Sequence, residues 1–410
     1  MHVIQRTRRW LASHFEKMLY DNALLVSLLT TVWRTTGREH YRLQVSETID
    51  WMIREMTLPG RAFAASLDAD SNGGEGRFYT WSYDEVLSVL GVDAEDFCKA
   101  YDITPQGNWE NVNILNRLDI NTSPKKDTEL AEETESRFSE AHARLFAVRA
   151  QRIAPALDDK VLADWNGLAI QALAQAGLTF NRPDWLDAAL KAFDFVVNAM
   201  MQDGRLHHSW CAGKCGGLAV SDDYANMIRA ALMLFETTGD NKYLATATDW
   251  LTLFDHYYRD KERGGYFYTA SDAEALIVHT RPTHDNATPA ANGVMVDVFA
   301  RLNSLDDEAD WQARTETHTR AFSGDSANNA FAMAGFLNGM DQLFNAVEIT
   351  LCGGKVAQSL HAVALKAAPP AHVVRYDSTS PAGVIICRGQ MCTPRLKTPE
   401  AIIQALRPRS

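Results

Sequence analysis

The chain has 410 residues, of which 46% are hydrophobic and 22% are charged, the balance of a soluble globular protein. It carries 40 Lys and Arg against 52 Asp and Glu, and the formal net charge of −12 repels nucleic acid and anionic membranes. No apolar run approaches the roughly 20 residues of a membrane span, and the basic start Met1–Trp10 lacks the apolar core of a secretory signal. We therefore expect a cytoplasmic protein with neither nucleic-acid nor membrane partners.

The cysteines and the Gly-rich turns suggest neither a metal nor a cofactor. Neither Cys211-x3-Cys215 nor Cys387-x4-Cys392 has the two-residue gap of zinc knuckles and redox motifs, so we expect ordinary thiols in a reducing compartment. The acidic turn Asp68–Glu75 resembles a calcium loop but lacks its full order of ligands. Gly353-Gly354 is typical of a turn rather than of a phosphate loop.

Paired helices repeat along the chain. Three short polar turns end on an aromatic residue, and apolar residues follow at four and eight positions beyond it, which is the stripe of a helix. The aromatic residues are Tyr41, Trp185 and Tyr243, with a weaker copy at Trp311. These aromatic-led helices carry several charges, so we expect them on the outside. The interval from Tyr41 to Trp185 (185 − 41 = 144) has room for two more pairs.

An almost uncharged helix precedes each turn. Helices that are apolar on most sides are buried, so these should form an inner layer. The predicted inner helices are Asp21–Thr35, Asn166–Leu178, Asp223–Thr237 and Asn292–Asn303, and a last pair is expected near residues 329–344. A regular succession of helix pairs indicates a solenoid or a closed ring.

The loops and the C-terminal part have a different pattern. Gly76–Thr80 and Gly265–Thr269 alternate aromatic residues after glycine, which predicts short β-hairpins at a rim. Beyond Asn345 the pattern predicts strands over residues 347–351, 372–376 and 383–387, with a helix over 359–367. We therefore expect a helical array over residues 1–345 and a small α/β segment over 346–410 that packs on it.

Each inner helix opens on polar residues beside small ones. N-capping of the helix is one explanation. The other is a site, because inner helices of identical hairpins run parallel and their N-termini meet at one mouth. A mouth rich in carboxyl groups suits glycoside hydrolysis, or proton abstraction next to a carbonyl. Aromatic residues at the rim suit stacking on sugar rings, although burial also explains each one alone.

The residues expected at this mouth form two sets. Those predicted to be catalytic, as proton shuttles, acids or bases, are His14, Glu16, Asp70, Asp223, His284 and Asp285. Those predicted to bind or orient substrate are Asp21, Asn22, Asp68, Asp159, Lys160, Trp165, Asn166, Asp222, Tyr224 and Asn292. His207-His208 and His279 are weaker candidates, because a lone histidine in a loop is usually solvated.

Long segments of the chain resemble, in order, the DUF255 family of YyaL-like and spermatogenesis-associated protein 20-like proteins. They are residues 14–22, 68–71, 158–167, 222–225 and 285–293, together with the tail that holds Cys387 and Cys392. Members of that family join a thioredoxin-like domain to an (α/α)6 toroid of the six-hairpin glycosidase type, akin to N-acylglucosamine and cellobiose 2-epimerases. The resemblance implies a mainly α fold, an (α/α)6 toroid that here lacks its first inner helix and the thioredoxin-like domain.

The resemblance places a site better than it names a reaction, since the family has no firmly assigned activity. We expect a small sugar-like ligand at the mouth, with epimerase-like or glycoside-hydrolase-like activity and no cofactor. The alternative is a non-catalytic scaffold that works with a thioredoxin-like protein partner, its polar motifs being caps and buried networks. An open ring would expose an apolar helix face, which invites such a partner.

Overall fold

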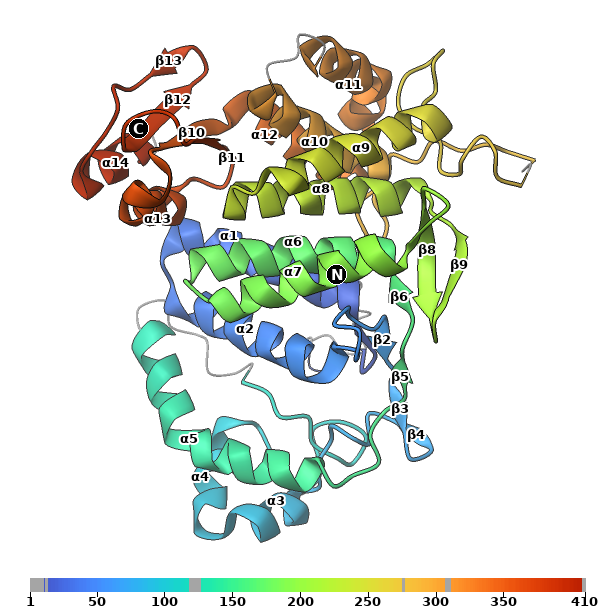
Figure 1. Ribbon diagram of the computed structural model, residues 1–410. Helices are drawn as coiled ribbons and strands as arrows, with labels where there is room; N and C mark the ends of the chain where they lie inside the picture. Colours follow the sequence, from blue (N-terminus) through green and yellow to red (C-terminus); the bar gives the residue numbers. More distant parts are fainter. Residues whose placement is uncertain (1–10, 12–13, 118–126, 275–276, 307–310, 408–410) are drawn as a thin grey trace. The chain divides into compact units, whose positions relative to one another are not determined.

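The computed structural model describes residues 11, 14–117, 127–274, 277–306 and 311–407, and for 127–137 and 355–356 only the backbone (Figure 1). The fold is mainly α, of the (α/α)-toroid type that the sequence predicts. Two compact units divide the chain. Unit 1 comprises Met1–Met18, Arg38–Gln44 and Ala65–Asp159, and unit 2 comprises Leu19–Gly37, Val45–Ala64 and Lys160–Ser410. Among the described residues, no helix combines the length and apolar character needed to cross a membrane.

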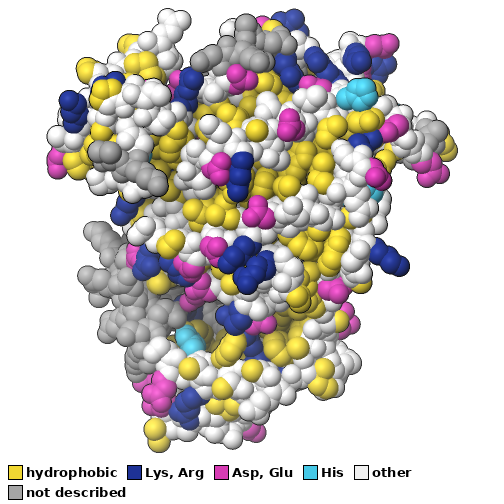
Figure 2. All heavy atoms as spheres, in the orientation of Figure 1, with side chains coloured by type: hydrophobic (Ala, Val, Ile, Leu, Met, Phe, Trp, Pro, Cys, Tyr) yellow, Lys and Arg dark blue, Asp and Glu magenta, His cyan; other side chains and the backbone are white. Residues whose placement is uncertain are grey.

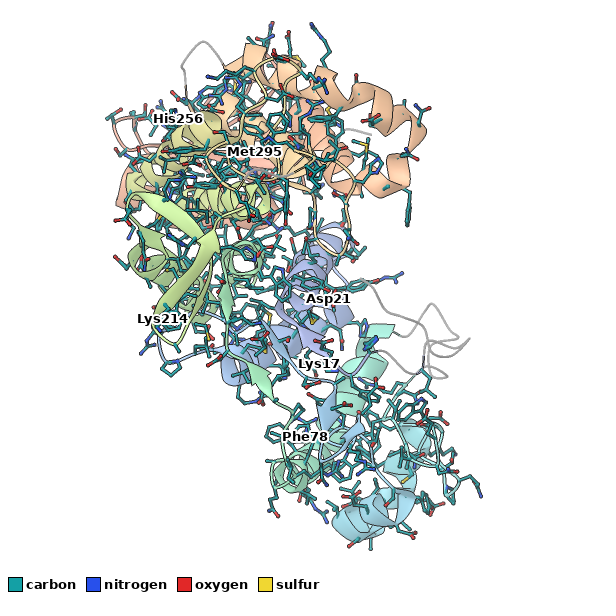
Figure 3. The ribbon with its side chains drawn as sticks, turned by 90° about the vertical axis from the view of Figure 1, so that its right-hand side faces the viewer. Lys17, Asp21, Phe78, Lys214, His256 and Met295 are labelled. Carbon is teal, nitrogen blue, oxygen red and sulfur yellow. A yellow bond between two sulfur atoms is a disulfide. The ribbon has the colours of Figure 1, made fainter. Side chains whose placement is uncertain are left out.

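Unit 2 is built on a row of inner helices that lie side by side (Figure 1). In order they are α1 (Leu19–Thr36), α6 (Ala163–Thr179), α8 (Ser221–Thr238), α10 (Ala291–Leu305) and α12 (Ala334–Asn345). The middle helices are buried almost all round, and Met295 of α10 lies in this packed interior (Figure 3). The predicted inner layer is therefore confirmed for α6, α8 and α10.

Outer helices pack against the inner ones. α7 (Pro183–Ala199) lies on α6, α9 (Asn241–Tyr258) on α8 and α11 (Trp311–Asn328) on α10. Near the start of each helix is the aromatic residue that marked it in the sequence, and each of these aromatic side chains is buried. α2 (Glu39–Trp51) continues into a π-helical turn, Met52–Met56. On the face shown in Figure 2, basic and acidic side chains are interspersed.

Glycine sets the spacing between inner helices at two Asn-Gly pairs. A Cβ atom on Gly167 of α6 would lie 2.8 Å from a backbone carbon of Asn226 in α8. A Cβ atom on Gly293 of α10 would lie 2.9 Å from the backbone nitrogen of Phe336 in α12. Any larger residue at either glycine would push the neighbouring helices apart.

Short strands link the helices of unit 2. β8 (Arg205–Cys211) pairs with β7 (Met201–Gln202), β6 (Val161–Leu162) and β9 (Lys214–Leu218). Lys214 lies at the end of the β8–β9 ribbon (Figure 3). Because β6 runs directly into α6, this pairing holds β8 beside the start of that helix.

The C-terminal segment is the small α/β unit that the sequence predicts. Its sheet has the order β11 (His372–Asp377), β10 (Val347–Cys352), β12 (Gly383–Arg388), β13 (Met391–Cys392), and only the β10–β11 pair is parallel. α13 (Gln358–Ala367) and α14 (Pro399–Leu406) share its apolar core. The strands begin next to Asn345, but the domain boundary there stays a prediction, since this segment belongs to unit 2.

Buried charges join this segment to the helices. The Glu236 carboxylate in α8 pairs with the Arg301 guanidinium of α10 and accepts a hydrogen bond from the backbone N–H of Val374 in β11 (3.0 Å). Arg301 also pairs with Asp297 at 3.1 Å. Glu236 exposes 2% of its surface, so its charge is compensated entirely by these contacts.

Unit 1 takes up most of the interval that had room for two more helix pairs. Its sheet joins β1 (Lys17–Met18), β2 (Ser66–Leu67) and β5 (Leu157–Asp158), and β3 (Asp70–Ser71) pairs with β4 (Gly74–Glu75). α3 (Tyr83–Leu90), α4 (Ala94–Ala100) and α5 (Asp127–Arg149) enclose a separate apolar core around Phe97. These helices form a unit of their own instead of further inner and outer pairs.

Of the two rim hairpins predicted from alternating aromatic residues, the first is wrong and the second forms in a minimal version. Gly76–Thr80 is a turn in which the Thr80 N–H donates to the Gly76 carbonyl (3.0 Å), and the Tyr79 ring stacks on Phe15. Near Gly265–Thr269, Tyr266 forms an antiparallel bridge with Arg259, the Phe267 N–H donates to the Tyr258 carbonyl (2.8 Å) and the Asp260 N–H donates to the Gly265 carbonyl (2.9 Å). The pairing ends there, and neither aromatic run forms a regular strand.

Candidate functional site

The N-termini of α6, α8 and α10 meet, as the parallel packing of inner helices predicts. The backbone N–H of Asp164, the second residue of α6, donates to Oδ1 of Asp223 in α8 (3.0 Å). The backbone N–H of Ala291, the first residue of α10, donates to Oδ1 of Asp222 (2.9 Å). The two adjacent aspartates of α8 thus reach the helices on either side, and the three helix starts share their caps.

β8 adds an imidazole to this meeting point. Nδ1 of His208 lies 2.9 Å from Oδ2 and 3.1 Å from Oδ1 of Asp223, whose side chain is fully buried. The hydrogen bond to Asp223 is the main reason that the pKa of His208 is raised to about 9. The ring is therefore an imidazolium at neutral pH, and Nδ1–H donates to the carboxylate.

The carboxyl groups here differ in their surroundings. Burial raises the pKa of Asp164 well above its usual range, and the neighbouring charge of Asp223 raises it further. Burial raises the pKa of Asp222 to about 6. Asp223 accepts hydrogen bonds from His208 and from the backbone N–H of Val220 (2.7 Å).

Tyr268 completes the group and, with His208, opens it to solvent. Burial and the charges of Asp222, Asp223 and Asp164 raise the pKa of the Tyr268 phenol. Tyr268 exposes 37% of its surface and the side chain of His208 exposes 38%. A ligand can therefore reach the group from the side of these two residues. We call Asp164, His208, Asp222, Asp223 and Tyr268 the acid cluster.

An unsatisfied amide lies one helical turn beyond the acid cluster. Asn226 of α8 is four residues after Asp222, exposes 1% of its surface and faces Gly167 of α6. Neither atom of its amide group has a hydrogen-bond partner in the structure. Leaving such a group unpaired costs about 1–3 kcal/mol. The position therefore suits a bound water or a ligand hydroxyl.

The acid cluster is better suited to proton transfer than to binding a metal ion. Asp164, His208 and Asp223 each place one ligand atom within 4.8 Å of the others, a grouping of the kind that binds cations. Each oxygen of Asp223, however, already accepts a backbone N–H, from Asp164 or Val220, and both contact His208. A cation would have to displace His208 from the carboxylate it neutralises.

Of the predicted site residues, Asp222 and Asp223 belong to the acid cluster, whereas three others have structural positions. Asn166 is fully buried and its amide bonds both the N–H and the carbonyl of Phe63 (2.9 and 3.0 Å). Asn292 bonds the N–H and carbonyl of Tyr266 in the same way (2.8 and 2.9 Å). The hydroxyl of Tyr224 accepts the backbone N–H of Leu206 (3.2 Å). All three hold the protein's own backbone and are closed to solvent.

The remaining predicted residues of unit 2 surround other helix starts. Asp285 caps two segments, since its carboxylate accepts the N–H groups of Ala290 (2.9 Å) and Gly335 (2.6 Å). His284 is exposed. Neither residue shares a hydrogen bond with the acid cluster among the described contacts. Asp21 and Asn22 lie in the first turn of α1, Lys160 is exposed, and the Trp165 ring packs against Tyr20 at 4.7 Å.

The other predicted residues, His14, Glu16, Asp68, Asp70 and Asp159, belong to unit 1. Glu16 and Asp70 are exposed, and the Asp70 N–H donates to Oδ1 of Asp68 (3.1 Å). In the same stretch, Lys17 has a pKa lowered to about 8 by burial and by Arg149. That the residues of unit 1 contribute to one mouth with the acid cluster stays a prediction.

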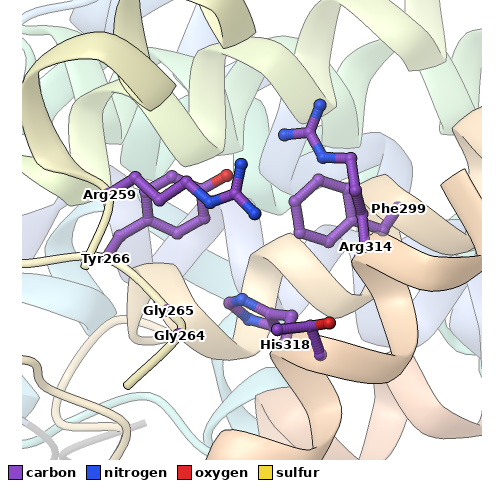
Figure 4. Close-up of a pocket in the computed structure, with 8 residues that line it drawn as sticks. Arg259, Gly264, Gly265, Tyr266, Phe299, Arg314 and His318 are labelled. Carbon is purple, nitrogen blue, oxygen red and sulfur yellow. The ribbon is translucent and has the colours of Figure 1, made fainter. Parts of the chain in front are cut away.

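A cavity elsewhere in unit 2 is too small for a substrate. Its lining includes Tyr266, Phe299, Arg314 and His318, and its volume is about 20 Å³ (Figure 4). Burial lowers the pKa of His318 to about 4, and its Nε2–H donates to the carbonyl of Asn292 (2.8 Å). Such a volume holds a single water molecule.

Known proteins similar to this chain include human spermatogenesis-associated protein 20, which is 25% identical over 401 residues, covering 88% of this chain and 51% of that protein. An uncharacterised protein of Caenorhabditis elegans is 27% identical over 386 residues, 86% of this chain and 50% of that protein. The chain is thus similar to spermatogenesis-associated protein 20 over most of its own length. It spans about half the length of these relatives. No family model matches it.

Solved structures that resemble the chain include sugar-converting enzymes. Cellobiose 2-epimerase from Bacillus thermoamylovorans has a TM-score of 0.40 at 8% identity, covering 81% of this chain and 63% of that one. A D-mannose isomerase has a TM-score of 0.39 at 12% identity, covering 75% and 76%. A family 105 glycoside hydrolase from C. acetobutylicum has a TM-score of 0.36 at 11% identity, covering 77% and 78%. The fold class rests on the helix array itself, and none of these activities is transferred to this chain.

Proposed function

We propose that the acid cluster is an acid–base site for a neutral, polyhydroxylated ligand of the sugar type. The observation that carries the proposal is the spread of pKa values among groups that lie together. Burial raises the pKa of Asp164 well above its usual range, Asp222 has a pKa of about 6 and His208 has a pKa of about 9. Pairs of titratable groups whose surroundings push their pKa values apart are typical of acid–base catalysis.

The roles follow from these protonation states. At neutral pH the Asp222 carboxylate is ionised and serves as the base, because its Oδ2 is not used in the cap to Ala291. The Asp164 carboxyl or the His208 imidazolium supplies a proton on the other side of the reacting bond. Asp223 holds His208 in place and in its charged form. The same groups serve epimerisation, by proton removal next to a carbonyl, and glycoside hydrolysis.

The charge and surroundings of the acid cluster favour a neutral ligand. The acid cluster contains three carboxyl groups and one imidazole, and a pKa of about 6 leaves the carboxyl of Asp222 negatively charged at neutral pH. An anionic substrate would be repelled, whereas hydroxyl groups can donate to carboxylates and accept from the imidazolium. Trp165, which is partly exposed, and Tyr268 offer ring faces of the kind that stack on sugars.

The decisive experiment follows proton exchange on a panel of monosaccharides and disaccharides in deuterated water. Incorporation of deuterium beside the carbonyl detects epimerisation, and release of reducing sugar detects hydrolysis. We expect Asp164→Asn and Asp222→Asn to lower the rate by at least about 100-fold, the usual effect of removing a general acid or base. Asp249→Asn, on the exposed side of α9, is the matched control and should keep full activity.

One observation favours a second candidate function. The carboxylates of Asp222, Asp223 and Asp285 all cap helix starts, as they would in a scaffold for a thioredoxin-like protein partner. Asn at these positions keeps an acceptor oxygen, so the substitutions separate the two candidates. If no sugar binds or exchanges, and Asp164→Asn and Asp222→Asn change only thermal stability, the acid–base proposal is wrong and the scaffold remains.

A further inference from the structure

The C-terminal sheet contains a disulfide bond, contrary to the expectation of ordinary thiols. Cys387 in β12 and Cys392 in β13 lie directly opposite each other in the antiparallel ladder and are bonded. The other cysteines, all within the described residues, take no part in this disulfide: Cys98, Cys211, Cys215 and Cys352. Cys98 and Cys352 are buried, so the bonded pair differs from them in its surroundings as well as in its chemistry.

The bond lies at an accessible edge of the sheet. Cys392 is exposed, and the adjacent Met391 exposes 62% of its surface. Next to them is a groove of about 320 Å³, whose lining includes Arg388, Met391, Cys392 and Arg407. The groove is large enough to hold the side chains of an approaching peptide. An attacking thiol can therefore reach the sulfur of Cys392 without unfolding the protein.

A purely structural role does not account for this bond well. The disulfide closes a loop with only four residues between the two cysteines, and the entropic stabilisation from a cross-link is smallest for short loops. The same hairpin is also held by hydrogen bonds between Thr393 and Ile386, with the Thr393 N–H donating to the carbonyl (2.9 Å) and the Ile386 N–H donating to Oγ1 (3.1 Å). The turn does not depend on the covalent bond.

The groove beside Cys392 is basic. Arg388 and Arg407 line the groove, and no acidic residue is among the residues that line it. Arg388 is fixed by donating to the last carbonyls of α14 and to that of Arg407 (3.3–3.4 Å). Positive charge near a cysteine favours the thiolate over the thiol, which assists both attack and departure in disulfide exchange.

We propose that Cys387–Cys392 is a reversible thiol–disulfide exchange site whose partner is a dithiol. The partner's thiolate attacks Sγ of Cys392, the Cys387–Cys392 bond breaks, and Cys387 leaves as a thiolate that takes a proton from water. The second thiol of the partner, as a thiolate, then attacks the partner's first sulfur in the mixed disulfide, and Cys392 leaves as a thiolate. Two electrons pass from the dithiol to the pair, which ends as two thiols while the partner ends as a disulfide.

Reduction changes the edge of the C-terminal sheet. β13 has only two residues, and they pair with β12 through Cys387↔Cys392 and Arg388↔Met391. Without the covalent bond, this short strand is free to separate from the groove it borders. The proposal is independent of the acid cluster, so either can fail without the other.

The test measures reduction of the folded protein. Full-length protein is equilibrated with graded dithiothreitol or with glutathione redox buffers, the thiols are alkylated, and each cysteine is read by mass spectrometry. We expect Cys387 and Cys392 to become alkylated together, reversibly, while the circular dichroism spectrum stays unchanged. Buried Cys98 and Cys352 are internal controls for folding, since they should remain unmodified. Resistance of the pair to reduction until urea unfolds the protein would overturn the proposal.

Two single variants test the order of attack and the kind of thiol. With oxidised glutathione, Cys387→Ser should form a mixed disulfide on Cys392 at least tenfold faster than Cys392→Ser does on Cys387. Equal rates, or the reverse order, would refute attack at Cys392. The native protein is also treated with dithiothreitol and with reduced glutathione at equal thiol concentration. Reduction of the disulfide by dithiothreitol alone supports a dithiol partner, whereas equal reduction by both reagents refutes a dithiol partner. Cys211→Ser is the matched control and should behave as the native chain.

Discussion

Asp222 caps a helix and also has a raised pKa. Its Oδ1 caps α10, while burial raises its pKa from 3.8 to about 6. A folded-state pKa above the unfolded value means that ionisation of this carboxyl lowers stability as the pH rises from about 4 to about 6. Above pH 6 the full cost remains, and below pH 4 it disappears.

We therefore predict that Asp222→Asn stabilises the protein at pH 8. The amide keeps the capping oxygen and removes the buried charge, so the free energy of unfolding should rise by up to about 3 kcal/mol, from about 1.4 kcal/mol for each unit of pKa shift. At pH 4 the variant and the native protein should unfold alike. Thermal unfolding at the two pH values checks this, and equal melting temperatures at pH 8 would contradict it.

His208 should respond to pH in the basic range. Its pKa is raised to about 9, chiefly by the hydrogen bond to Asp223, so its contribution to stability is complete below pH 6.5 and is lost as the pH rises through about 9. In His208→Gln this loss should be absent. Unfolding by urea between pH 6 and pH 10 measures the difference, and NMR titration of the ring gives the pKa directly. A ring that titrates near pH 6.5 would refute the pairing with Asp223.

Asn226 provides a test in which stability and binding move in opposite directions. Replacing a buried, unpaired amide by an apolar side chain of similar shape removes a desolvation cost, so Asn226→Leu should raise the free energy of unfolding by about 1 kcal/mol. The same variant should bind sugar more weakly if the amide serves a ligand. Calorimetric unfolding and ligand titration measure the two effects. A loss of stability would mean that the amide is already satisfied in solution.

At the residue scale, part of the site could be predicted from the sequence. Asp222 and Asp223 were predicted because they open an apolar helix. His208 was underrated because only the pairing of β8 with β6 brings it to the helix starts, and that pairing is not visible in local pattern. Asp164 and Asn226 were missed because their significance depends on which neighbours bury them. The alternation within Arg205–Cys211, followed by a Gly-containing turn, was the available signal for a strand.

At the scale of helices and loops, the Asn-Gly pairs at the starts of α6 and α10 play the same structural role. The asparagine ties a loop residue to the helix start, and the glycine lets the next inner helix approach. Sequence periodicity found these helices to within a few residues, because a helix that is buried on most sides carries few charged residues. It could not find the loop that each asparagine holds, since Phe63 is 103 residues away from Asn166.

The hydrogen bonds of Asn292 predict that its loss destabilises the protein more than the loss of an exposed asparagine does. Asn292→Ala removes the amide's hydrogen bonds to Tyr266 and Pro282 and leaves buried backbone groups unpaired, so the free energy of unfolding should fall by about 3 kcal/mol. Asn303→Ala, at an exposed position of the same helix, should change it by less than about 0.5 kcal/mol. Urea unfolding of the two variants makes the comparison. Equal effects would show that the clamp is dispensable.

In the whole molecule, buried charge connects the helix array to the C-terminal segment. Glu236→Gln would weaken the pair with Arg301, so we expect a loss of about 3 kcal/mol and faster proteolytic release of the segment that follows Asn345. Glu348→Gln on β10 is the control, because that side chain is only partly buried. Unchanged proteolysis of Glu236→Gln would mean that apolar packing alone holds the segment.

The division into two units was the least predictable feature. Residues 83–149 have helical patterns that could belong to the array, yet they enclose a core of their own. Whether a helix joins an array depends on its partners, and the spacing of apolar residues within that helix does not identify them. The C-terminal strands were easier to predict, since short runs rich in β-branched residues, such as Val347–Leu351, favour strands over helices.

The shared caps have an electrostatic consequence. Each helix start carries the positive end of a macrodipole, equivalent to about half an elementary charge, and three such ends meet where α6, α8 and α10 begin. The carboxyl oxygens of Asp222 and Asp223 already accept backbone N–H groups at these helix starts and offset the positive ends. Arg301, in the last turns of α10, lies toward the opposite, negative end. A phosphorylated sugar would thus meet a field that the protein has already neutralised, whereas an uncharged one would meet dipoles oriented for its hydroxyl groups.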